Sequence, residues 1–170
     1  MDIIYIILGN ICSLFAMGTD SISSSRKTIS SMLWVQNASQ LFYGVGSILL
    51  KGYSGTVQNV ICIIRNLTVI KGIKSKFLEW ALVILGIVVG LIFNNLGIIG
   101  LLPIIANAQY SIVVFKFKNN ERILKISFLI TALLFAVFSI SIWNIVGMCT
   151  NLVVAVSTFI FLIKSKKDKN

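Results

Sequence analysis

The chain has 170 residues, of which 57% are hydrophobic and only 12% are charged. A soluble domain carries about 25% charged residues, so this composition excludes an ordinary soluble protein and predicts an all-α integral membrane protein. The net charge is +10, but nearly every basic residue lies between or after apolar runs, as in the basic loops of membrane proteins. We therefore expect the lipid bilayer as a partner and no nucleic acid.

Seven apolar stretches have the length and composition of spanning helices. About 20 mostly apolar residues cross a bilayer, with about 17 as the lower end. In chain order, the predicted spans are Ile3–Gly18, Thr28–Leu50, Gly55–Ile70, Phe77–Phe93, Gly97–Phe117, Ile123–Ile142 and Asn144–Ile163. The first stretch lacks the positively charged start and the clear cleavage site of a signal peptide, so we expect it to stay in the mature protein.

The basic residues are distributed unevenly over the loops. With seven spans, successive loops alternate between the two faces of the membrane. One face then receives fourteen of the fifteen Lys and Arg residues, and the other receives only Lys51. Because positively charged loops stay inside, this split predicts a multi-pass protein with its N-terminus outside and its C-terminus in the cytoplasm.

A segment of the first half recurs, without a gap, in the second half. Residues 41–66 align with residues 133–158, at a constant offset of 92 positions. The identical pairs are Leu41/Leu133, Val45/Val137, Ser47/Ser139, Ile48/Ile140, Gly55/Gly147 and Asn59/Asn151. Such a repeat predicts a protein built twice. Because one further helix intervenes, both copies have the same orientation, as in transporters whose halves are related by an axis along the membrane normal.

The repeat predicts a 3+1+3 organisation. Residues 1–71 form the first three-helix bundle, 72–96 a connector helix, 97–164 the second three-helix bundle, and 165–170 a basic cytoplasmic tail. Between Glu79 and Asn94 the connector has no polar side chain. A helix that is apolar all round fits a position in contact with lipid.

Polar and small residues recur at spacings of three and four in three of the helices. The stripes are Asn37, Gln40, Gly44 and Ser47; Gly55, Asn59, Cys62 and Asn66; and Gly147, Asn151, Val154 and Thr158. Residues so spaced share one helix face, and these faces must point away from lipid. Such residues commonly join membrane helices to one another. For Asn59 and Asn151 we favour a functional interpretation, because two amides at equal depth can converge on one cavity at the repeat axis.

The residues needed for most catalytic chemistry are missing from the sequence. There is no His, and Cys12, Cys62 and Cys149 all lie within apolar runs. The five acidic residues are assigned to ends or loops: Asp2, Asp20, Glu79, Glu121 and Asp168. We therefore expect no enzyme activity, no metal site and no cofactor. Without buried acids for a proton relay, the class that fits best is a facilitator of a neutral polar solute.

Arg65 is the one basic residue placed within a predicted span. It lies six residues before Lys71, which corresponds to about 9 Å of helix. The side chain is therefore expected to reach the cytoplasmic interface or to pair with Glu79, rather than to contact the solute.

Three helices, a connector and three helices, with the N-terminus outside, resemble the SWEET-like superfamily of sugar facilitators, PQ-loop proteins and vitamin transporters. Within it, the sequence is similar to the YgjV-type family of bacterial inner-membrane proteins. The residues that carry this resemblance are the Gly-x-x-x-Asn of Gly55 and Asn59, continuing to Arg65-Asn66, and the run Leu101–Ile105 around Pro103. The resemblance implies that Asn59 and Asn151 contact the solute, with Tyr43 and Phe135 completing the pocket.

The sequence leaves two functions open. The first is a small inner-membrane transporter or facilitator of a neutral, sugar-like or vitamin-like solute, with its cavity between two three-helix bundles. The second is a non-transporting scaffold or accessory subunit, in which the polar stripes only pack helices together. Either protein could form a homo-oligomer. The two readings differ in whether a hydrated cavity exists at Asn59 and Asn151.

Overall fold

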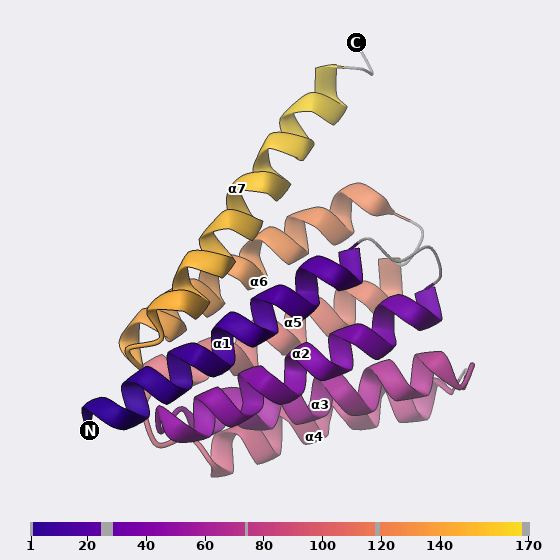
Figure 1. Cartoon of the computed structure of the whole chain (residues 1–170). Coiled ribbons are helices and arrows are strands. Elements are labelled where there is room, and N and C mark those ends of the chain that lie inside the picture. The colour runs from indigo at the N-terminus through magenta and orange to yellow at the C-terminus, as the bar shows by residue number, and fades with distance from the viewer. Residues whose placement is uncertain (1, 25–28, 74, 118–119, 168–170) are drawn as a thin grey trace.

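A computed structural model describes residues 2–24, 29–73, 75–117 and 120–167. The described residues form seven helices and no strands (Figure 1): α1 (Ile3–Ser24), α2 (Ile29–Leu49), α3 (Tyr53–Ile70), α4 (Lys76–Ile92), α5 (Ile98–Phe117), α6 (Glu121–Ser141) and α7 (Ile145–Lys167). Each predicted span corresponds to one of these helices. The all-helical prediction is therefore confirmed, and the largest difference is the end of α1, which continues six residues beyond Gly18.

Local sequence signals explain where several helices begin. Ser75 precedes α4, and its hydroxyl accepts a hydrogen bond from the backbone N–H of Leu78. Asn120 precedes α6, and its side-chain oxygen accepts from the N–H of Ile123 at 3.1 Å. These are N-caps, which satisfy backbone donors that have no partner within the helix.

The α2–α3 and α6–α7 turns have the same backbone geometry. Lys51 and Trp143 both adopt positive φ, 57° and 62° respectively. In each turn the N–H of the next residue reaches back to a serine carbonyl: Gly52 to Ser47 at 2.7 Å, and Asn144 to Ser139 at 2.9 Å. This is the Schellman arrangement of a helix C-terminus. These residues form three pairs at the 92-residue offset of the sequence repeat, Ser47/Ser139, Lys51/Trp143 and Gly52/Asn144, so the local conformation recurs together with the sequence.

Six of the seven helices form a ring. In the described part of the chain, α1 packs against α2, α2 against α3, α3 against α5, α5 against α6, α6 against α7, and α7 against α1. Helix α1 does not contact α3, and α5 does not contact α7. Each set of three helices is therefore a row, and the two rows together enclose one interior.

Helix α4 lies outside the ring and packs only against α3 and α5. Its inner face consists of Leu82, Val83, Gly86 and Gly90. The carbonyl of Gly86 accepts a hydrogen bond of 2.8 Å from the side chain of Gln58. Helix α4, which is apolar after its first turn, is thus joined to the ring through its backbone, which its glycines leave accessible.

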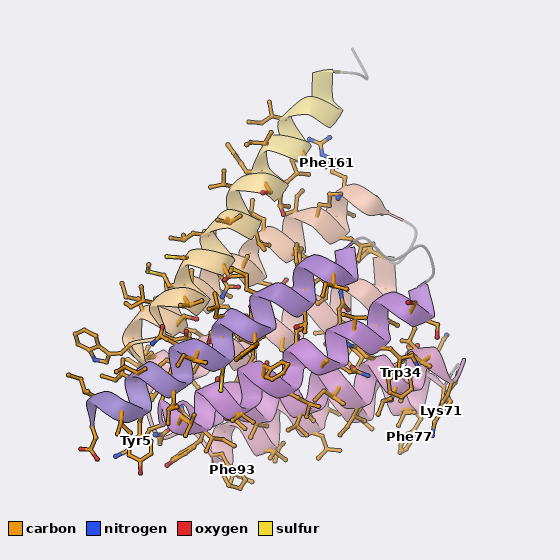
Figure 2. The ribbon with its side chains drawn as sticks, in the orientation of Figure 1. Tyr5, Trp34, Lys71, Phe77, Phe93 and Phe161 are labelled. Carbon is orange, nitrogen blue, oxygen red and sulfur yellow. The ribbon has the colours of Figure 1, made fainter. Side chains whose placement is uncertain are left out.

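The distribution of side chains is that of a membrane protein. Among the described residues, large apolar side chains cover the outside of every helix, and thirteen polar residues are buried, as many as the buried apolar ones. Soluble proteins bury apolar residues preferentially. Exposed Trp34, Lys71 and Phe77 lie at one end of the bundle, and Tyr5 and Phe93 at the other (Figure 2). Aromatic residues at both ends are typical of the two membrane interfaces.

Four helices, α1, α5, α6 and α7, are long and apolar enough in their described residues to cross a membrane by length and composition alone. The other three fall short for different reasons. Helix α4 has only 17 residues, and α2 and α3 carry buried amides, including Asn37, Gln58 and Asn59.

Candidate cavity inside the helix ring

The ring encloses a cavity of about 200 Å³. Each of the six ring helices contributes lining residues, whereas α4 contributes none. The lining residues are Asp20, Gln40, Tyr43, Ser47, Asn59, Cys62, Arg65, Asn107, Tyr110, Phe128, Thr131, Ala132, Phe135, Phe138, Ser139, Ile142, Asn144, Thr150, Asn151 and Val154. Most of the polar residues among them come from α2, α3, α5 and α7.

All four residues selected from the sequence, Tyr43, Asn59, Phe135 and Asn151, line this cavity. Asn59 is only 7% exposed, and its side-chain amide has no hydrogen-bond partner among the described residues. The side-chain nitrogen of Asn151 donates to the carbonyl of Gly147 at 2.8 Å, which leaves its oxygen without a protein partner in the same part of the chain. Both amides therefore retain hydrogen-bonding capacity toward the cavity.

Asp20 is a lining residue that the sequence analysis assigned wrongly. It was expected at a helix end or in a loop, but it lies within α1 and lines the cavity. The hydroxyl of Ser39 donates to its carboxylate, and Tyr43 lies beside it. The physical reason is that α1 continues past Thr19, whose hydroxyl donates to the carbonyls of Phe15 and Ala16 in its own helix.

Arg65 also differs from expectation. Its Nη1 donates to Oδ1 of Asn107 at 3.3 Å and to Oγ of Ser111 at 3.1 Å, and its guanidinium lies 5.5 Å from the ring centre of Tyr110. Arg65 forms no ion pair with Glu79 or any other described carboxylate. The side chain thus points into the ring, because Asn107, Tyr110 and Ser111 of α5 lie within its reach and contact it.

Asn107 is the centre of a hydrogen-bond network that the sequence analysis missed. Its oxygen accepts from Arg65 and from the thiol of Cys62, and its nitrogen donates to Oε1 of Gln58 at 2.8 Å. The signal was present in the sequence: Asn107, Gln109, Tyr110 and Ser111 form a polar run within an otherwise apolar span.

Other side-chain amides join helices to one another: Asn37 and Asn66, which belong to the predicted stripes, and Gln109, which does not. The side-chain nitrogen of Asn66 on α3 donates to the oxygen of Asn37 on α2 at 3.0 Å, and both residues are buried. Gln109 on α5 donates to the hydroxyl of Thr131 on α6 and accepts from Ser127. The stripes therefore contain residues of both kinds, packing amides and cavity amides.

The cavity is closed at the end of the bundle that holds the N-terminus. There Asn10 of α1 donates to the carbonyl of Trp143 at 2.8 Å and accepts from the N–H of Val146 at 2.9 Å. Leu50, Phe138 and Ile142 form a buried apolar cluster at the same end. Toward the opposite end, α7 diverges from α1 (Figure 1).

The described residues contain no group of three or more His, Cys, Asp or Glu side chains that could hold a metal ion. Asp20 is the only acidic residue among the described residues that line the cavity. The chemistry that the site offers is hydrogen bonding by amides and hydroxyls, together with one carboxylate and one guanidinium.

Comparison with known proteins assigns the chain to a family. A family described as Imp-YgjV, bacterial inner membrane protein, matches residues 7–169, which is nearly the whole sequence. The chain belongs to this family. Comparison with curated proteins and with solved structures found no match. The assignment places this Imp-YgjV protein in the bacterial inner membrane, in agreement with its apolar exterior and its several long apolar helices.

Proposed function

We propose that this protein is a transporter or facilitator that moves a small polar solute across the inner membrane through the cavity in its ring. The observation that carries the proposal is a cavity lined by all six ring helices, with amides, hydroxyls, a carboxylate and a guanidinium among its lining groups, within a bundle whose outside is apolar. Sites of repeat transporters lie near the middle of the membrane, between the repeated units. In this proposal Asn59, Asn151, Tyr43 and Phe135 contact the solute.

We also propose that α1–α3 and α5–α7 are two copies of one unit, as in the SWEET-like superfamily, with α4 as the connector between them. Two features support the repeat. The α2–α3 and α6–α7 turns share one backbone geometry. In addition, exchanging α1–α3 with α5–α7 converts the α3–α5 contact into the α7–α1 contact, and both contacts exist. An axis along the membrane normal would have this effect.

The proposed orientation has the N-terminus outside and the C-terminus in the cytoplasm, because the charge distribution of the loops favours it. In that orientation the closed end, with Asn10 and Trp143, faces outward, and the end at which α7 diverges faces the cytoplasm. The proposed partners are the lipid bilayer and the solute, without an enzymatic reaction, and a homo-oligomer is compatible with this arrangement.

The second candidate is a scaffold or accessory subunit that transports nothing. The packing amides support it, since the Asn66–Asn37 and Gln109–Thr131 hydrogen bonds join neighbouring helices. It leaves the unpaired amide of Asn59 without a role, and the first candidate is therefore the stronger.

Uptake into proteoliposomes tests the proposal, with a panel of labelled sugars, polyols, nucleosides and amino acids. We expect uptake of at least one solute class by the wild-type protein. Asn59→Ala and Asn151→Ala should each lower it at least about tenfold, since an unpaired buried polar group costs about 1–3 kcal/mol and 1.4 kcal/mol is tenfold in affinity. Both variants should melt within a few degrees of the wild-type protein.

Asn37→Ala is the matched control, because it removes an amide that packs helices and does not line the cavity. It should lower the melting temperature while the remaining folded protein keeps its uptake. A scaffold predicts the opposite pattern, with no solute carried by the wild-type protein and with loss of stability as the only effect of all three substitutions.

A further inference from the structure

Two opposite charges line the cavity. Among the lining residues that the structure describes, Asp20 and Arg65 are the only charged side chains. The remaining polar lining groups are amides, hydroxyls and a thiol, which carry no charge. A cavity with one carboxylate and one guanidinium is neutral as a whole, but it is strongly dipolar.

Neither charge is neutralised by the protein in the part of the chain that the structure describes. The carboxylate of Asp20 accepts from the hydroxyls of Ser39 and Tyr43, and Nη1 of Arg65 donates to Asn107 and Ser111. All four partners are neutral. An unpaired charge within a membrane protein is costly, and it marks a functional site by default.

The two charges lie on different walls. Asp20 is on α1 and its hydrogen-bond partners are on α2, whereas Arg65 is on α3 and its partners are on α5. Helix α1 packs against neither α3 nor α5, and no ion pair joins Asp20 to Arg65. The cavity that both residues line has a volume of about 200 Å³.

The free donors of Arg65 are suited to a carboxylate or a similar anion. Nη1 is occupied by Asn107 and Ser111, but Nε and Nη2 form no hydrogen bonds with the described residues. A guanidinium binds planar anions through two parallel hydrogen bonds. The ring of Tyr110 supports one face of the guanidinium and helps to hold its orientation.

We infer that the solute is a small zwitterion, whose cationic group pairs with Asp20 and whose anionic group pairs with Arg65. The inference rests on the proposed function and deepens it, since a zwitterion is net-neutral and polar. Asn59 and Tyr43 border the same space and offer hydrogen bonds to the body of the solute. A solute with a single charge would neutralise one wall and leave the other charge unpaired, which favours the zwitterion.

Ligand-induced stabilisation of the purified protein in nanodiscs tests this inference, because a ligand that binds only the folded state raises the melting temperature. The probes are glycine, β-alanine and γ-aminobutyrate, three zwitterions with increasing separation between their charges. The controls are glycinamide, which carries only the cation, N-acetylglycine, which carries only the anion, and glycolamide, which carries neither. We expect a shift with at least one zwitterion and none with the three controls at the same concentration.

Variants of the two charged residues supply a second readout. Asp20→Asn and Arg65→Gln should each weaken the apparent affinity for the bound zwitterion at least tenfold. Asp20→Asn should also lessen the discrimination against N-acetylglycine, and Arg65→Gln that against glycinamide. Asp2→Asn and Lys51→Gln remove the same charges outside the cavity and should leave the affinity unchanged. If Asp20→Asn or Arg65→Gln fails to fold, two measurements still test the inference. They are the probe series on the wild-type protein and the same series on Arg65→Lys, which should keep the preference for zwitterions.

The inference is overturned if no zwitterion shifts the melting temperature, if the singly charged controls shift it equally, or if both charge variants keep full affinity. If the wild-type protein binds glycolamide or a sugar, and Asn59→Ala loses this binding, the inference of a zwitterionic solute is wrong while the proposed function stands. Binding of a zwitterion without its uptake into proteoliposomes would contradict transport and support only the ligand class.

Discussion

Buried amides in this protein differ in what they bind, although they look alike in the sequence. Asn37 and Asn66 pair with each other, Asn107 connects Gln58, Cys62 and Arg65, and Asn59 has no partner among the described residues. Spacing predicted that such residues face inward. It could not separate packing amides from cavity amides, because that difference depends on which side chains a neighbouring helix presents. Arg65 was misplaced for the same reason, since its partners lie on α5.

This difference between amides predicts a difference in stability. Asn107→Ala removes a donor to Gln58 and an acceptor for Arg65 and Cys62. It should lower the free energy of unfolding by about 1–3 kcal/mol, the cost of leaving buried polar groups unpaired. Asn59→Ala breaks no protein hydrogen bond among the described residues. It should therefore change the free energy of unfolding by less than about 0.5 kcal/mol, as substitutions do where no hydrogen bond or close packing is lost. Equal losses in denaturant unfolding of the two variants would contradict this account of the network.

At the scale of elements, the sequence predicted the bounds of most helices to within a few residues, but not how closely the helices pack against one another. Long apolar runs define α5, α6 and α7, and the predicted and observed ends of these helices differ by a few residues. The end of α1 was missed because Thr19 and Asp20 are polar, yet the helix continues through both: the hydroxyl of Thr19 donates to a carbonyl of its own helix, and Asp20 lines the cavity. Glycines decide how closely some elements approach. A Cβ added at Gly55 on α3 would lie 2.6 Å from Cε1 of Phe138 on α6.

Gly55→Ala should therefore destabilise the closed end of the bundle. Phe138 is only 2% exposed and belongs to the apolar cluster with Leu50 and Ile142, so its ring has no free space to move into. Overpacking of this kind costs about 1–3 kcal/mol. Gly18→Ala is the matched control, because a Cβ at Gly18 meets nothing within 4 Å. If thermal unfolding in detergent shows the same stability for the two variants, the packing of α3 against Phe138 does not require a glycine at position 55, and this account is contradicted.

At the scale of the whole molecule, the arrangement is polar inside and apolar outside, with a ring around one cavity. Composition alone was sufficient to predict a helical membrane protein, and the family assignment agrees with it. Closure of the ring could not be predicted from the sequence. It depends on contacts between residues far apart in the chain, such as Asn10 with Trp143 and Arg65 with Ser111, and no local pattern encodes such contacts.

The central claim is that Asn151 borders a hydrated cavity whereas neighbouring residues of α7 face lipid, and cysteine labelling tests it most directly. Asn151→Cys and Val153→Cys are compared in a background in which Cys12, Cys62 and Cys149 are replaced by serine. Asn151 lines the cavity and Val153 is 65% exposed on the outside of the bundle. Lys51→Cys, in an exposed turn, is the positive control. In the proposed orientation this turn lies on the outer face, so a membrane-impermeant reagent should label it in intact spheroplasts.

In broken membranes, where both faces are accessible, a hydrophilic thiol reagent should label Asn151→Cys and not Val153→Cys. The thiolate is the reactive form of cysteine, and apolar surroundings suppress it, so labelling requires water around the thiol. The solute found by the binding or uptake screens should protect Asn151→Cys from the reagent. Absence of labelling at this position, or equal labelling of Val153→Cys, would contradict the cavity and with it the proposed transport function.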